Sequence, residues 1–173
     1  YETLKQKTDK SQAKRLNSAA KVLARALDTK AVELRKKTPK STEADDLWKK
    51  AADFYVDSAR GDDTAKGVEL EEVGTRLYVM GMHFAQVPDN QDSFVGWKGE
   101  RRRGEKYWTD AATLLDSAIQ RSPSSKTMIK LGQVYGFLGK SKEAAGIYAK
   151  MFDGESFVDS ATSKIDRAVL SAK

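Results

Sequence analysis

The sequence contains no cysteine in its 173 residues, a single histidine and three prolines. Without cysteine, the chain forms no disulfide and offers no thiolate metal site or thiol nucleophile. The histidine, His83, lies between Met82 and Phe84 in an expected helix, without spaced partners for a catalytic triad or a metal cluster. We therefore expect no enzyme, no metal site and no cofactor.

Long apolar runs are also absent, because none approaches the roughly 20 residues that span a bilayer. Residue 1 is Tyr rather than Met, which indicates a trimmed or processed chain. We expect a soluble protein, either cytoplasmic or exported after removal of a leader. The sequence does not decide between these compartments.

Positive charge is concentrated at the beginning of the chain. The net charge is +6; residues 1–40 hold 12 Lys and Arg against 4 Asp and Glu, whereas residues 41–173 hold 19 against 21. This asymmetry is typical of electrostatic contact with nucleic acid or an anionic membrane, or of a solvated helix with lysines on its outer face. We favour the solvated helix and keep the electrostatic contact as the alternative.

Residues 11–86 have the apolar spacing of three helices. In the first helix, a stripe on one face should be buried, and it consists of Leu16, Ala20, Leu23, Leu27 and Leu34. We expect this helix to end before Pro39, and a break near Asp28 and Thr29 would also fit. The second helix should begin near Thr42, whose spacing to Asp45 is that of a capping box.

The third helix is expected over residues 66–86. Its predicted apolar face consists of Leu70, Val73, Leu77, Met80 and Phe84, widened by Val79 and Met82. Residues 87–104 contain a proline and three glycines and are predicted to form a long loop, a kind of segment that is often functional.

Four further helices are expected after the loop, at about 105–121, 126–138, 142–152 and 156–172, with a left-handed cap at Gly139. No segment alternates with period two as a strand would. The sequence thus predicts a single all-α domain over residues 1–173, with about seven helices in antiparallel pairs.

Residues 128–148 carry the most specific pattern of the chain. At characteristic spacings it has a large residue, a Leu-Gly pair, a Tyr, a Gly, an Ala and a second aromatic, which are Met128, Leu131, Gly132, Tyr135, Gly139, Ala144 and Tyr148. This pattern resembles a tetratricopeptide repeat. The match departs from the family at Met151, where a small residue is usual, and in lacking the closing Pro.

A preceding half-repeat is indicated by Ala111, Leu115, Ala118 and Pro123, so the resemblance covers residues 105–153. The helix expected at 156–172 would then cap the repeats. Residues Trp48, Ala51, Ala52 and Tyr55 have the spacing of Trp108, Ala111, Ala112 and Leu115, 60 residues later. The helix at 105–121 can therefore be the first or the second helix of a repeat.

The resemblance implies stacked helix pairs in a right-handed superhelix, whose concave groove binds a peptide, helix or loop of another protein. An irregular α-helical bundle is the alternative fold. In the family, groove-lining side chains lie on the first helix of each pair; the matching positions here are Lys126, Ile129, Lys130, Gln133, Gly136 and Phe137. The two lysines would favour an acidic segment or a chain-terminal carboxylate.

A second candidate surface surrounds the end of the predicted loop. It consists of Trp97, Lys98, Arg101, Arg102 and Arg103. Arginine and tryptophan are enriched at protein-interface hot spots, and they can also stack on nucleic-acid bases. A simple exposed loop, with its tryptophan folded onto the core, is equally compatible with the sequence.

We expect a non-catalytic scaffold that binds another protein or peptide through the groove and the 87–104 loop. An electrostatic binder of nucleic acid or an anionic membrane, acting through the basic first helix and Arg101–Arg103, is the alternative. A second copy of the chain is a further partner that the sequence leaves open.

Overall fold

A computed structural model describes residues 10–59, 65–88 and 100–153. The described residues form six helices and no strand, which confirms the all-α prediction. The helices are α2 (Lys10–Lys37), α3 (Thr42–Ala59), α4 (Gly67–Phe84), α5 (Arg101–Arg121), α6 (Ser125–Phe137) and α7 (Ser141–Asp153). The seventh helix, predicted at 156–172, lies outside the described residues.

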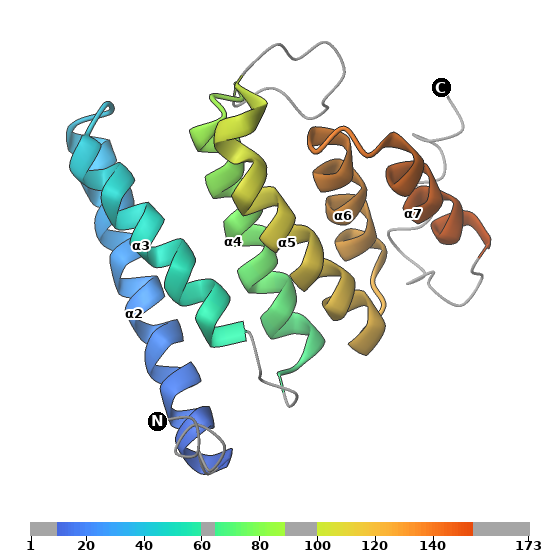
Figure 1. Cartoon of the computed structure of the whole chain (residues 1–173), viewed down its shortest axis with the longest axis horizontal. Coiled ribbons are helices and arrows are strands. Elements are labelled where there is room, and N and C mark those ends of the chain that lie inside the picture. Colours follow the sequence, from blue (N-terminus) through green and yellow to red (C-terminus); the bar gives the residue numbers. More distant parts are fainter. Residues whose placement is uncertain (1–9, 60–64, 89–99, 154–173) are drawn as a thin grey trace, which may run out of the picture.

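Consecutive helices pack as antiparallel pairs, α2 with α3, α4 with α5 and α6 with α7, and Figure 1 shows the pairs side by side in chain order. Short turns join the helices of the first and third pairs. One of these turns is closed by Gly139, which has a φ of +76°, as the sequence predicts. Two backbone bonds complete the cap: Gly139 N–H to the Gly136 carbonyl and Lys140 N–H to the Tyr135 carbonyl.

The buried face of α2 matches the predicted stripe only in part, since Leu27 and Leu34 pack half-buried against the core. Ala24 and Ala31 are fully buried and Asp28 is 5% exposed, whereas Leu16 and Leu23 are 64% and 43% exposed. The helix also continues through Asp28, so the alternative of a break there is wrong. The physical reason is that Asp28 receives hydrogen bonds from two neighbouring helices, and this turns its own face inward.

The first turn of α3 is capped by Ser41, one residue before the predicted cap. The Ser41 hydroxyl accepts a hydrogen bond from the Ala44 N–H at 3.2 Å. Asp45, predicted to complete a capping box with Thr42, pairs instead with Arg35 of α2 and His83 of α4. An acid expected to act locally thus joins three helices.

Glycines at intervals of seven residues bring α4 against α5. A Cβ atom on Gly74 would lie 2.9 Å from Leu115 Cγ, and one on Gly81 would lie 2.4 Å from Trp108 Nε1. The same packing places Gly104 against the Gly81 carbonyl, inside α5. Helix α5 therefore begins at Arg101, four residues before the expected start, and residues 89–99 of the predicted loop lie outside the described residues.

The rest of the predicted face of α4 is largely correct. Leu70, Val73, Leu77 and Met80 are at most 2% exposed. Val79 was expected to widen this face but is 40% exposed, because it lies on the side of α4 opposite the glycines. The largest core side chain, Trp108, is fully buried and stacks on Phe137 of α6 at 5.0 Å between ring centroids.

Candidate functional site

The predicted groove on α6 is only partly present. Lys126 is exposed, and Ile129 and Gln133 are half-buried. Gly136 is buried and Phe137 is fully buried, so their assignment to a groove is wrong. Phe137 cannot face a ligand because it lies between Trp108 of α5 and Tyr78 of α4, with ring centroids at 5.0 and 6.2 Å.

Lys130 connects α6 to α4. Its ammonium donates to Thr75 Oγ1 at 2.9 Å and lies 3.6 Å from Glu71 Oε1, and its side chain is 21% exposed. The Glu71 carboxylate balances much of its charge. Of the two lysines expected to favour an acidic ligand, only Lys126 projects into solvent.

The second predicted surface falls largely on a helix. Trp97 and Lys98 lie outside the described residues. Arg101, Arg102 and Arg103 are exposed and form the first turn of α5, and Arg103 pairs with Glu100. Cations are disfavoured at a helix N-terminus by the helix dipole, so helix stability does not account for three arginines there.

Helices α2, α4 and α6, the first members of their pairs, are linked by ion pairs. Arg25 Nε of α2 donates to Glu72 Oε1 of α4 at 3.1 Å, and Lys21 Nζ lies 3.7 Å from Glu72 Oε2. The link from α4 to α6 is the contact of Lys130 with Glu71. We call the surface that these three helices share the first-helix face.

Apolar side chains are exposed on the α4 part of the first-helix face. Val68 is 70% exposed and Val79 is 40% exposed, with half-buried Thr75 between them on the same side of the helix. Val68 and Val79 are three helical turns apart, and the contact of Lys130 with Thr75 lies between them, so they are two separate exposed apolar positions on one side of α4. The sequence could already have indicated this exposed position, because Val79 makes the apolar face of the helix wider than a buried face needs to be.

A buried carboxylate joins the first two helix pairs. Asp28 accepts hydrogen bonds from Trp48 Nε1 at 2.9 Å and Tyr55 Oη at 3.2 Å, both from α3. Arg76 of α4 adds a two-pronged contact at 2.7 and 2.5 Å. Burial and the neighbouring Asp28 raise the pKa of Tyr55 to about 12, so this phenol remains a hydrogen-bond donor.

A second polar cluster surrounds His83 in the last turn of α4. His83 Nε2 lies 3.0 Å from Asp45 Oδ1, and its ring packs edge-on against Trp48 at 4.6 Å between centroids. The Arg35 guanidinium lies over the Trp48 ring, 5.0 Å from its centroid. Burial lowers the pKa of His83, which favours the neutral ring, although Asp45 acts in the opposite direction.

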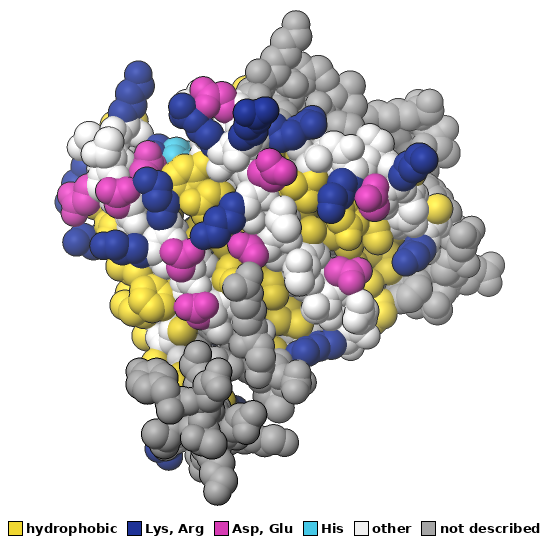
Figure 2. All heavy atoms as spheres, in the orientation of Figure 1, with side chains coloured by type: hydrophobic (Ala, Val, Ile, Leu, Met, Phe, Trp, Pro, Cys, Tyr) yellow, Lys and Arg dark blue, Asp and Glu magenta, His cyan; other side chains and the backbone are white. Residues whose placement is uncertain are grey.

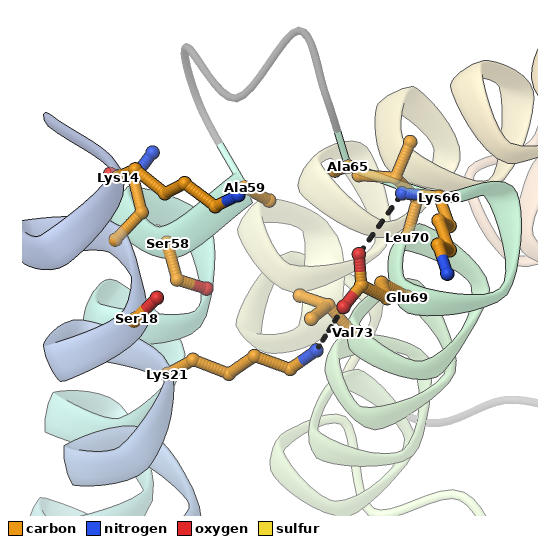
Figure 3. A pocket seen from close by; sticks show the side chains of 11 residues that line it. Lys14, Ser18, Lys21, Ser58, Ala59, Ala65, Lys66, Glu69, Leu70 and Val73 are labelled. Carbon is orange, nitrogen blue, oxygen red and sulfur yellow. Dashed lines mark hydrogen bonds and ion pairs between the residues drawn. The ribbon is translucent and has the colours of Figure 1, made fainter. Parts of the chain in front are cut away.

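A pocket of about 240 Å³ lies where α2, α3 and α4 meet (Figure 3). Lys14, Ser18 and Lys21 approach it from α2, opposite Glu69. The Glu69 carboxylate accepts the Lys66 backbone N–H at 3.0 Å and lies 3.7 Å from Lys21 Nζ. Lys21 and Glu69 pair with each other across the pocket, and the lining does not by itself identify a ligand.

No helix within the described ranges is long and apolar enough to cross a membrane. Residues 10–59, 65–88 and 100–153 also contain no group of three or more His, Cys, Asp or Glu side chains placed to hold a metal ion. No family model, curated protein or solved structure matches the chain.

Proposed function

We propose that the chain is a tetratricopeptide-like helical-repeat module that binds another protein and catalyses no reaction. The observation that carries the proposal is the first-helix face. Its three helices come from successive pairs, and its α4 part presents Val68 and Val79 to solvent between ion-paired neighbours. Exposed apolar side chains on a face that spans several helices can anchor a contact with another protein.

The α6 part of this face supplies Lys126, Ile129 and Gln133 from the predicted groove. Ile129 adds a half-buried apolar contact, and Lys126 adds an exposed cation. These residues support a partner segment that lies across α4 and α6, with an apolar side chain near Val79 and an acidic one near Lys126. We propose Arg101–Arg103, at the start of α5, as a separate contact for the same partner.

Site-specific photo-crosslinking tests the proposal. Benzoylphenylalanine is introduced at Val79 or Ile129, with Asp57, exposed on α3, as the matched control. We expect the same protein from the native source to be cross-linked at the two first-helix positions and not at Asp57. Adducts at all three positions alike, or at none, would contradict the proposed surface.

The electrostatic alternative is less well supported by the charges of α2. Lys21, Arg25 and Arg35 are each paired with a carboxylate, so part of the positive charge is balanced internally. Figure 2 shows Lys and Arg interspersed with Asp and Glu on the visible face, without an extended patch of one sign. Nucleic-acid binding that weakens steeply with salt and is lost when Arg101–Arg103 are replaced by Ala would favour this alternative.

A further inference from the structure

The large exposed apolar side chains of the described residues are concentrated on α2. Leu16, Val22 and Leu23 are 64%, 68% and 43% exposed, and the other two, Val68 and Val79, are on α4. Helix α2 lies at one end of the stack, on the left in Figure 1. The end of the stack therefore exposes an apolar surface distinct from the first-helix face.

Part of this surface has the spacing of a coiled-coil seam. Leu16, Ala19, Leu23 and Ala26 follow one another at intervals of three, four and three residues, and both alanines are exposed. Repeats of this kind place side chains in one line along a helix, ready to pack against a second helix. Alternating leucine and alanine would let that helix approach closely. We call these four residues the end seam.

Cations stand at both ends of the end seam. Arg15 is exposed beside Leu16, and Lys30, one turn beyond Ala26, has a side chain that is 60% exposed and only a 3.9 Å contact with Glu43. Arg15 and Lys30 are separated by about 22 Å along the helix axis. A helix bound to the seam would meet a positive charge near each of its ends.

We propose that the end seam docks an amphipathic helix of another protein, with an apolar stripe and acidic residues about 15 positions apart. Helix α2 carries nine Lys and Arg against two acids, so a second copy of α2 would bring like charges together. An acidic helix gains from the same charges. This surface is separate from the first-helix face, so it is tested independently.

A designed peptide provides the probe. It is a helix of about 20 residues with Leu and Ala at the heptad seam positions and Glu at the flanking positions, and its matched control has Lys in place of every Glu. Fluorescence anisotropy should show that the Glu peptide binds the full chain and that the Lys peptide does not. Affinity for the Glu peptide should fall as salt is raised.

Two sets of variants locate the binding. Leu16→Gln with Leu23→Gln should weaken binding of the Glu peptide by at least about tenfold, since both anchors are lost. Val68→Gln with Val79→Gln is the control, matched in exposure but placed on the first-helix face. Because all four side chains are exposed, the variants should keep the melting temperature of the unchanged protein.

Charge reversal supplies the sharpest test. Arg15→Glu with Lys30→Glu should reduce the preference for the Glu peptide over the Lys peptide by at least about tenfold, since both flanking cations become acids. Equal affinity for both peptides, no binding, or equal weakening by the α4 variants would overturn the proposal. It would also be overturned if Leu16→Gln with Leu23→Gln abolished self-association in sedimentation or binding to anionic vesicles, since the seam would then serve a second copy or a membrane.

Discussion

Replacing Asp28 with Asn removes a charge from the joint between the first two helix pairs while keeping the size of the side chain. The carboxylate is 7% exposed and accepts hydrogen bonds from Trp48, Tyr55 and Arg76. An amide has one acceptor oxygen, and its NH2 group would face groups that are themselves donors. Arg76 would lose its counter-charge at the same time.

The expected loss follows from the burial of the two partners. Removing one member of a buried ion pair costs about 3–5 kcal/mol. The side chain of Arg76 is 35% exposed, so water compensates for part of this loss. We therefore expect the free energy of unfolding to fall by about 2–3 kcal/mol. For a chain of this size the melting temperature should fall by roughly 4–12 °C.

Urea denaturation followed by far-UV circular dichroism measures this loss. Asp57→Asn, an exposed change of the same chemistry on α3, is the control and should stay within about 0.5 kcal/mol of the unchanged protein. Arg76→Met completes a double-mutant cycle, in which the two losses should be less than additive. A loss at Asp28 no larger than that at Asp57, or strictly additive losses, would refute the ion-pair argument.

Three further predictions concern His83 and Gly81 in α4 and Gly146 in α7. Because burial lowers the pKa of His83, protonation at acidic pH favours the unfolded chain; the free energy of unfolding should fall as pH drops below about 6.5, and the fall should be smaller in His83→Gln. Urea midpoints at several pH values measure both, and equal slopes would contradict the idea. Gly81→Ala should cost about 1–3 kcal/mol, because its Cβ would meet Trp108 at 2.4 Å. Gly146→Ala, with nothing within 4 Å of the new Cβ inside α7, should instead stabilise by about 0.5–1 kcal/mol, and thermal melts of both variants decide the sign.

The extent of most helices could be predicted because apolar residues recur at helical spacing over whole segments. The start of α5 could not, since Gly104 and three arginines are typical of a loop. Gly104 lies in a helix because its missing side chain admits the Gly81 carbonyl. The seven-residue spacing of Gly67, Gly74 and Gly81 was visible in the sequence and could have indicated a close helix pair.

The face of α2 was harder to predict because a polar residue determines it. Periodicity places leucines inward and gives no reason to bury Asp28. That reason is Arg76, 48 residues later, together with two side chains of α3. The error at Phe137 is similar in kind, since the groove positions of a repeat family take no account of Trp108 from the preceding pair. Long-range partners of this sort cannot be read from local spacing.

The 60-residue correspondence between Trp48 and Trp108 has a structural counterpart. Both residues lie on the second helix of their packed pair, α3 and α5. Their partners differ, because Trp108 packs on Gly81 of α4 whereas Trp48 donates a hydrogen bond to Asp28 of α2.

Helix α2 contains no glycine, so it lacks the close backbone approach that joins α4 to α5. Alanines, Asp28, ion pairs to α4 and the half-buried Leu27, Val32 and Leu34 hold it in place, and Leu16 and Leu23 take no part in this attachment. In a helix packed only for its own stability, these leucines would occupy the inner face, where they could remove the most apolar surface from water. Their outward placement leaves two of the four leucines of α2 available for a contact that the described helices do not provide. Exposure thus falls along one stripe of α2, from the exposed Leu16 and Leu23 to the half-buried Leu27 and Leu34, and the end seam occupies the N-terminal part of the helix.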